Sequence, residues 1–239
     1  SEHPNSEYSL ASTIVWDRCI MTTGCAMDGE DVFLSETNPA DPKERFLLLP
    51  IPGGGRFPPA ALKQKALEAG FAEYRFVHDS YIAEHGMEEV EKHFKVSEQP
   101  GCADYVYRAK DLASLEGRDL AKKRNNIRQF EKECVAHGWK VETVRLSSAN
   151  AAACVECLEQ WRNEQEDANW TGILACEGSA IRRALADFEG LEFRGLMVLI
   201  NGAPRGFGVA GRLNRDTGVL LFEKASERYK GLYQYLDRE

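Results

Sequence analysis

The side chains that most readily suggest chemistry are a run of cations between residues 118 and 132. They recur at four-residue intervals in two series: Arg124, Arg128 and Lys132, and Arg118 with Lys122. On a helix, residues four apart share one face, and a cationic face can bind the phosphates of a nucleic acid or a lipid. Because Glu131 and Glu133 lie among these cations, an ordinary solvated helix surface is the alternative interpretation.

A second candidate pair, Glu223 and Lys224, follows the apolar run 219–222 directly. Side chains at the end of a strand can reach a cleft. Acyl transfer needs a base for the acceptor and a group that stabilises charge on the carbonyl oxygen. Glu223 could act as the base if burial raised its pKa, and Lys224 could stabilise the oxyanion or bind phosphate. An ion pair on the surface is the alternative interpretation.

Other motifs point to structure rather than chemistry. Cys154 and Cys157 have the spacing of half a zinc site, but no second Cys pair and no nearby His completes it, so two small core residues explain them better. The Gly-rich segment 52–56 lacks the Lys-Ser/Thr of a phosphate-binding loop, and we interpret it as a surface loop. We therefore expect no metal site, and no cofactor is certain.

The composition is that of a globular protein. Apolar runs such as 46–51 and 196–200 are far shorter than the roughly 20 residues that cross a bilayer, so no membrane span is expected. Seven Cys, an odd number, favour reduced thiols, and the polar N-terminus does not resemble a secretion signal; both features predict a cytoplasmic protein. The net charge of −8 arises in residues 1–100, which hold 17 acidic and 9 basic side chains.

Local patterns predict that strands and helices alternate in the first half. Helices are expected at about 8–20 and 60–70, and strands at 32–34, 46–49, 74–77 and 105–107, with a Gly/Pro loop at 50–59. Gly70 provides a helix stop. The alternation favours an α/β or α+β fold and closes a first unit near residue 110.

The second half begins with the longest helical pattern, 114–137, which Gly138 ends. A strand at 140–146 and helices at about 148–161 and 179–188 follow. Three apolar runs separated by two turn signals then predict an antiparallel meander over 196–224. The predicted order of this half is therefore β-α-α-β-β-β.

Three groups of segments carry a resemblance to a known family. They are 6–9 with Trp16; 104–107, 111–117 and 123–127 with Phe130; and 222–225 with 230–234. In order and spacing they resemble the phosphatidylglycerol lysyltransferase C-terminal domain family (DUF2156), a group of tandem GNAT-like proteins related to the Fem aminoacyltransferases. The resemblance implies two GNAT-like domains with mixed sheets flanked by helices. For characterised branches it implies transfer of an aminoacyl group from tRNA to an acceptor such as a lipid head group.

The resemblance also implies site residues. The implied donor-binding residues are Arg124, Asn125, Arg128, Arg228, Gly231 and Tyr233. The last three lie where GNAT enzymes have an Arg/Gln-x-x-Gly-x-Gly/Ala loop, whose backbone N–H groups at a helix N-terminus hold pyrophosphate. Tyr233 replaces the small residue of that loop and would narrow the approach of coenzyme A. Gly231 could equally serve only a tight turn.

Members of the family usually continue beyond this loop with another helix and further strands. Here Leu232, Tyr235 and Leu236 still show helical spacing close to the final residue, so we expect a second domain that is incomplete at its C-terminus. The predicted domains are residues 1–110 and 111–239, the second of which includes the basic linking helix.

The leading hypothesis is an aminoacyltransferase-like enzyme with its cleft between the two halves. Its donor would be aminoacyl-tRNA or acyl-CoA, and its acceptor a lipid head group or a peptide. Glu223 and Lys224 would serve the transfer step. Two alternatives remain open: a noncatalytic binding or regulatory module on the same scaffold, and an acetyl-CoA-dependent N-acetyltransferase.

Overall fold

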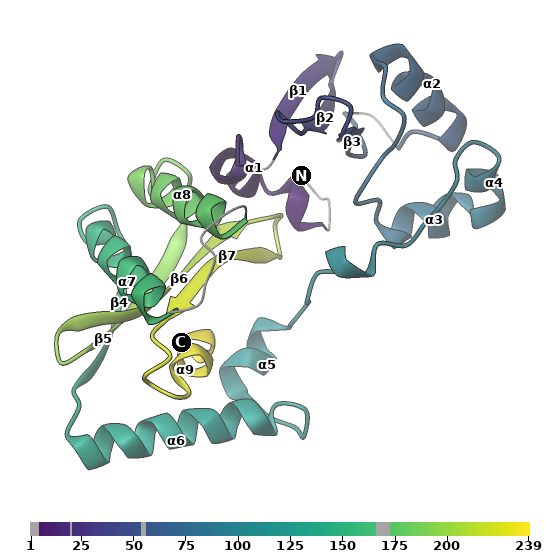
Figure 1. Ribbon diagram of the computed structural model, residues 1–239. Helices are drawn as coiled ribbons and strands as arrows, with labels where there is room; N and C mark the ends of the chain where they lie inside the picture. Colours follow the sequence, from purple (N-terminus) through teal and green to yellow (C-terminus); the bar gives the residue numbers. More distant parts are fainter. Residues whose placement is uncertain (1–4, 20, 54–55, 166–172) are drawn as a thin grey trace. The chain divides into compact units, whose positions relative to one another are not determined.

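A computed structural model describes residues 5–19, 21–53, 56–165 and 173–239 of the chain (Figure 1). Two compact units are present, Ser1–Asp104 with Leu213–Arg215 (unit 1) and Tyr105–Arg212 with Asp216–Glu239 (unit 2). Each unit has a sheet flanked by helices, which is consistent with the expected α+β class. The named strands of both sheets pair antiparallel, so the expected mixed sheets are not found in the described residues. The tandem GNAT-like architecture and the domain boundary after residue 110 stay predictions.

Unit 1 is built on a three-stranded antiparallel sheet of order β1-β2-β3. The strands are β1 (Thr22–Asp28), β2 (Asp31–Thr37) and β3 (Arg45–Leu47). The helical segments are η1 (Ser6–Tyr8), α1 (Leu10–Trp16), α2 (Pro59–Ala69), α3 (Asp79–His85), α4 (Met87–Glu91) and η2 (Pro100–Cys102). Strand β1 and helices α3 and α4 had no counterpart in the predicted elements.

Helix α2 confirms the helix predicted at 60–70. Pro59 stands in its first turn, where the fixed φ of proline suits a helix start, and Gly70 ends it in a left-handed conformation with φ of 73°. Leu62 and Ala66 are buried on its inner side. The hydroxyl of the buried Tyr8 donates to the carbonyl oxygen of Leu49 over 3.0 Å and so ties the N-terminal segment to the core of this unit.

Two predicted strands are absent from segments that the structure describes. Tyr74 forms only an isolated bridge to Leu47, and residues 105–107 form no strand at all. Tyr105 and Val106 are 89% and 87% exposed. Both predictions rested on aromatic and β-branched residues, but a strand also needs a neighbour that pairs with its backbone. In the Gly-rich loop, residues 54–55 lie outside the described residues.

Unit 2 contains a four-stranded antiparallel sheet of order β4-β5-β6-β7. The strands are β4 (Val141–Arg145), β5 (Arg194–Ile200), β6 (Ala203–Arg212) and β7 (Gly218–Ala225). The helices are α5 (Ala109–Ser114), α6 (Ala121–His137), α7 (Ala151–Glu164), α8 (Ile173–Ala186) and α9 (Leu232–Arg238). The order from β4 to β7 confirms the predicted β-α-α-β-β-β arrangement, although α8 begins earlier than expected.

Helices cover both faces of this sheet (Figure 1). Helices α7 and α8 lie on one face, and α9 and α6 lie on the other. On the α9 side, Phe130, Val198, Ile200, Leu232 and Leu236 belong to one buried apolar cluster. No helix among those described is both long and apolar enough to cross a membrane.

The helix predicted at 114–137 is interrupted. Helix α5 ends at Ser114, Leu115 adopts a left-handed conformation with φ of 53°, and α6 begins only at Ala121. The guanidinium of Arg124 donates to the carbonyl oxygens of Leu115 and Gly117, which lie in the connection. Gly138 ends α6 as predicted, with φ of 65°. Helical periodicity continued through the connection, but a left-handed residue breaks the helix regardless of pattern.

Candidate functional site

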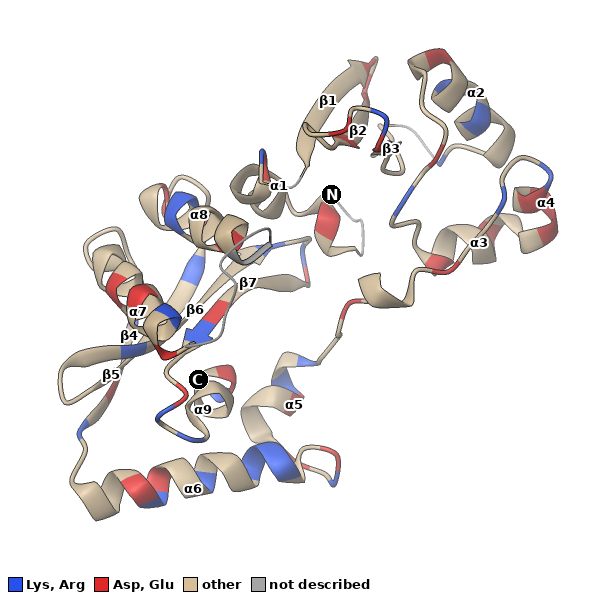
Figure 2. Cartoon of the chain, in the orientation of Figure 1, with Lys and Arg blue, Asp and Glu red and all other residues tan. Residues whose placement is uncertain are grey.

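Strand β7 is an edge strand of the unit 2 sheet and carries both Glu223 and Lys224. Successive side chains of a strand point to opposite faces, so these neighbours face different helices. Lys224 pairs across the sheet with Phe207, and Glu223 pairs with Gly208. In Figure 2 an acidic and a basic band of the ribbon follow each other near the end of β7. The structure therefore does not place the two predicted catalytic side chains on one face.

Lys224 lies on the face that α7 and α8 cover, and it is only 8% exposed. Its Nζ donates to Oε1 of Glu177, on α8, over 2.8 Å. The same nitrogen lies 4.4 Å from the centre of the Trp161 ring, on α7, a distance suited to a cation–π contact. A buried ammonium needs such partners, because leaving water is costly. The surface ion pair considered from the sequence does not describe Lys224, whose partner is Glu177 on α8 in a mostly buried position.

Glu223 lies on the opposite face, toward α9 and α6. Its Oε1 is buried and makes no hydrogen bond to any residue that the structure describes. Burial raises the pKa of Glu223 to about 7, and the negative charge of Asp237 adds to the rise, whereas Lys123 and Lys224 oppose it. Asp237 is itself paired with Lys123 over 2.6 Å. A carboxyl with this pKa can take up and release a proton near neutral pH.

Tyr233, on α9, links the two sides of the β7 edge. Burial raises the pKa of its hydroxyl, while hydrogen bonds involving the Ala225 backbone and the Trp161 indole oppose the rise. The charge of Glu223 also acts on this hydroxyl. The Tyr233 hydroxyl is therefore close enough to Glu223 to be affected by its charge. It also contacts the Trp161 indole, over whose ring the Lys224 ammonium lies.

Glu164 holds the loop between β7 and α9. Its carboxylate accepts from the Ser226 hydroxyl over 2.8 Å and from the Glu227 backbone N–H over 3.1 Å. Nε of Arg228 lies 3.3 Å from the same carboxylate. Sequence reasoning missed Glu164. A signal was present, because an acidic residue at a helix C-terminus is unfavourable there unless it has a partner elsewhere.

Gly231 has a packing role in the structure. It adopts φ of 94°, and a Cβ at this position would lie 2.2 Å from the carbonyl oxygen of Asn126 on α6. No side chain larger than hydrogen fits so close an approach. This contact accounts for glycine at residue 231, and its role in donor binding stays a prediction, as do those of Arg228 and Tyr233.

The cations predicted to form one face between residues 118 and 132 lie in different environments. Arg124 is used by the α5–α6 connection, whereas Asn125 and Arg128 are exposed on α6. Acidic and basic residues alternate further along the helix (Figure 2), and Glu131 pairs with Arg238 over 3.0 Å. Lys123, which was not among the predicted site residues, acts on Glu223 together with Lys224. In the described part of the chain, no three His, Cys, Asp or Glu side chains form a potential metal site.

Comparisons with known proteins place these residues in a wider context. The chain is similar over its whole length to 78% of a crystallised protein of unknown function from Bacteroides thetaiotaomicron VPI-5482, with a TM-score of 0.82 and 21% identity, so the two share a fold. Over 97% of its length it is also similar to 73% of a chain named for the C-terminal domain (DUF2156) of a lysylphosphatidylglycerol synthetase from Agrobacterium fabrum, with a TM-score of 0.49 and 11% identity.

The search of curated proteins found no match. The family model described as "Phosphatidylglycerol lysyltransferase, C-terminal" matches residues 67–239, which include every candidate site residue of unit 2. Because that match covers well over half of the chain, the protein belongs to the phosphatidylglycerol lysyltransferase C-terminal domain family.

Proposed function

We propose that this protein is an aminoacyltransferase-like enzyme. In this proposal it moves an aminoacyl or acyl group from a polyanionic donor, such as aminoacyl-tRNA, to the amine or hydroxyl of an acceptor such as a lipid head group. Family membership supports the reaction class, since the family is named for a lysyltransferase. The observation that carries the proposal is the carboxyl of Glu223, whose oxygen is buried and whose pKa is raised to about 7.

Glu223 is the proposed general base. The acceptor's nucleophilic oxygen or nitrogen attacks the ester carbonyl carbon of the donor and gives up its proton to Glu223. When the bond to the donor's leaving oxygen breaks, Glu223 returns the proton to that oxygen. A base works best when its pKa lies near the working pH. Burial and the nearby charge of Asp237 put Glu223 in that range.

Other side chains have supporting roles in this proposal. Arg228, whose side chain is 79% exposed, exchanges its ion pair with Glu164 for a donor phosphate. The Glu164 side chain is only 11% exposed, but its carboxylate keeps the hydrogen bonds from Ser226 and Glu227 when Arg228 leaves. Asn125 and Arg128 add to the binding of the donor from the exposed side of α6. Lys224 acts indirectly in this scheme, because its ion pair and its contact with Trp161 support the surroundings of Tyr233.

The test is transfer of a labelled amino acid from charged tRNA to lipid vesicles or to an amine acceptor. Glu223→Gln should lower the rate by at least about 100-fold, the usual contribution of a general base, while leaving the thermal melt cooperative. Glu142→Gln is the matched control, because it removes a carboxylate from the same sheet at a side chain that is 43% exposed. Equal rates for wild type and Glu223→Gln would refute the role of Glu223.

A second candidate function is a noncatalytic binding module. It is favoured by the internal partners of two predicted site cations, since Lys224 pairs with Glu177 and Arg124 binds backbone carbonyls. Titration with charged tRNA, acyl-CoA and coenzyme A distinguishes the candidates. Binding of charged tRNA that weakens in Arg228→Ala supports the transferase. The absence of binding by all three ligands supports the module. Binding of acyl-CoA and coenzyme A without binding of charged tRNA supports an N-acetyltransferase.

A further inference from the structure

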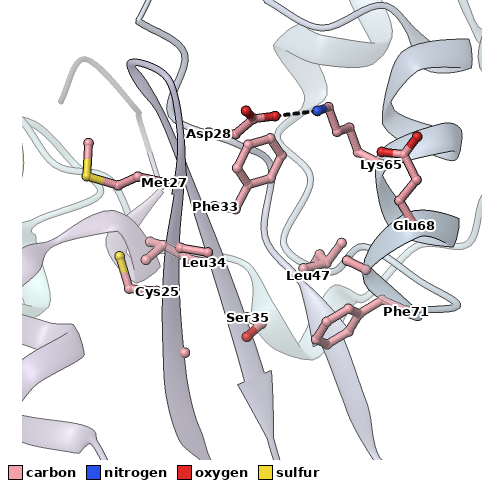
Figure 3. Close-up of a pocket in the computed structure, with 13 residues that line it drawn as sticks. Cys25, Met27, Asp28, Phe33, Leu34, Ser35, Leu47, Lys65, Glu68 and Phe71 are labelled. Carbon is pink, nitrogen blue, oxygen red and sulfur yellow. Dashed lines mark hydrogen bonds and ion pairs between the residues drawn. The ribbon is translucent and has the colours of Figure 1, made fainter.

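Unit 1 contains a cavity of about 380 Å³ between its sheet and helix α2 (Figure 3). This volume falls in the range of about 300–1,000 Å³ that is typical of small-molecule sites. Its walls come from all three strands and from α2 and the residues that follow it. All of its lining residues belong to unit 1, so an inference about this cavity does not depend on the function proposed for unit 2.

The cavity exists because small residues occupy one face of the sheet. Gly24 lies opposite Ser35 in the register, and Ala26 lies opposite Phe33. These residues share the face of Asp28, which meets Lys65 of α2. In Figure 3, Phe33, Leu47 and Phe71 lie on this side of the sheet, whereas Cys25 and Met27 point to the other side. The cavity is therefore a space above Gly24 and Ala26 that is open to solvent, with apolar and aromatic walls.

The polar end of the cavity already holds an ammonium group. Nζ of Lys65 lies 2.5 Å from a carboxylate oxygen of Asp28 and 5.8 Å from the centre of the Phe33 ring. Glu68, which lines the cavity, and Asp31 also act on this ammonium through their negative charge. The net charge of the surrounding part of the chain is also negative, since residues 1–100 hold 17 acidic and 9 basic side chains. Such a field attracts cations and repels anions.

We propose that this cavity binds a small amphipathic cation, an ammonium group attached to a compact aromatic or aliphatic body. The apolar body occupies the space above Gly24 and Ala26. The ligand's ammonium pairs with the carboxylates of Asp28 and Glu68 at the opening of the cavity. The ion pair of Lys65 with Asp28 shows that this place can hold a cation. The Lys65 and Asp28 side chains are 34% and 64% exposed, and exposed ion pairs of this kind are weak, so Asp28 can change partners at small cost.

Three probes with one common apolar body test the charge requirement. The full chain is titrated with 4-phenylbutylamine, 4-phenylbutanol and 4-phenylbutanoate while amide NMR shifts of residues 24–28 and 65–71 are followed. The amine should bind most tightly and the carboxylate most weakly, and the preference should shrink as added salt screens the carboxylates. The proposal is overturned if the amine does not shift these amides, or if the carboxylate binds as tightly as the amine.

Two substitutions locate the binding. Ala26→Phe fills the space beside Phe33 and should abolish binding of the amine. Lys65→Gln removes the internal competitor and should tighten binding of the amine about two- to fivefold, the range expected for an exposed ion pair. Lys63→Gln is the matched control, because it removes the same charge from α2 at a side chain that lies over Phe94 and does not line the cavity.

The direction of the Lys65→Gln effect separates this proposal from its rivals. A site for anions would lose affinity when Lys65 is removed, and a purely apolar site would not respond. Either result overturns the proposal, as does amine binding that survives in a folded Ala26→Phe variant. Thermal melts of each variant establish that it is folded, and Lys65→Gln, an exchange on the helix surface, provides a test even if Ala26→Phe is unstable.

Discussion

At the scale of single residues, Glu223 and Lys224 show how strand geometry separates sequence neighbours. The sequence suggested one cooperating pair at the end of a strand, but the two side chains point to opposite faces of β7. Lys224 has gained an ion partner and an aromatic ring, while Glu223 has a buried oxygen without a hydrogen bond in the described part of the chain. Their chemical properties therefore differ, and each predicts a different experiment.

Because folding raises the pKa of Glu223, we expect the folded protein to lose stability as the pH rises. Its pKa is about 7 in the folded chain and near 4.5 when exposed, so folding favours the protonated form. The contribution of this group is fully present below about pH 4.5 and disappears as the pH rises through about 7. Glu223→Gln should therefore be more stable than wild type by about 1–3 kcal/mol at pH 8.5, and the difference should vanish near pH 4.

Urea unfolding across this pH range measures the difference, with Glu142→Gln as the exposed control that should show no such trend. A Glu223→Gln variant that is less stable than wild type at pH 8.5 would contradict the burial of the charged carboxylate.

Because Lys224 is mostly buried and paired with Glu177, we expect its removal to destabilise the protein more than the removal of a surface lysine. Lys224→Met leaves Glu177, whose side chain is only 20% exposed, without its cation, and should lower the free energy of unfolding by about 2–4 kcal/mol. Lys140→Met breaks an ion pair whose lysine side chain is 76% exposed and should cost less than about 1 kcal/mol. A double-mutant cycle with Glu177→Gln isolates the coupling, and a coupling near zero would contradict the prediction.

At the scale of elements, α9 depends on its contact with α6. Gly231 starts α9 with a positive φ and lies against the backbone of Asn126. Leu232 and Leu236 then reach the apolar cluster beneath the sheet. Helix α9 is only 7 residues long, and short helices owe their stability to tertiary packing rather than to helix propensity.

Gly231→Ala should therefore be severe, with a loss of at least about 3 kcal/mol from the strained φ and the overlap with α6 together. Gly202→Ala is the matched comparison, because Gly202 has φ of 78° but nothing within 4 Å of the added Cβ, so only about 1–2 kcal/mol of backbone strain is expected. Thermal or urea unfolding of both variants tests this. Equal losses would mean that the contact with Asn126 has no importance.

At the scale of the whole molecule, each unit has its own sheet and its own buried side chains. Leu62 is 2% exposed in unit 1, and Phe207 is fully buried in unit 2. Leu62→Ala and Phe207→Ala should each destabilise the unit that contains them by about 2–5 kcal/mol.

Hydrogen exchange provides the measurement, because it reports opening region by region. Leu62→Ala should accelerate exchange in α2 and β3 more than in β6, and Phe207→Ala should show the reverse. Equal acceleration in both units by either variant would show that the chain opens as a single cooperative body.

The order of elements in unit 2 could be predicted because its signals are local. The meander of β5, β6 and β7 has connections at 201–202 and 213–217, within a residue or two of the predicted turns, and Gly138 marks the end of α6. The family resemblance likewise depended on residues in a fixed order, and the family match confirms it. The strands expected at 74–77 and 105–107 did not form because pairing is not local. Residues 74–77 meet β3 only through the bridge of Tyr74 to Leu47, and no strand that the structure describes pairs with residues 105–107.

What the sequence determined by itself is the mixed α/β content, most helices and strands of unit 2, the family, and the types of residue available for chemistry. The tertiary structure decided which of those residues meet. It separated Glu223 from Lys224, assigned Arg124 to a backbone connection, brought Lys123 and Asp237 toward Glu223, and opened a cavity above Gly24 and Ala26. The physical reason is that burial, pKa and proximity depend on the faces of packed elements, which no local pattern of residues specifies.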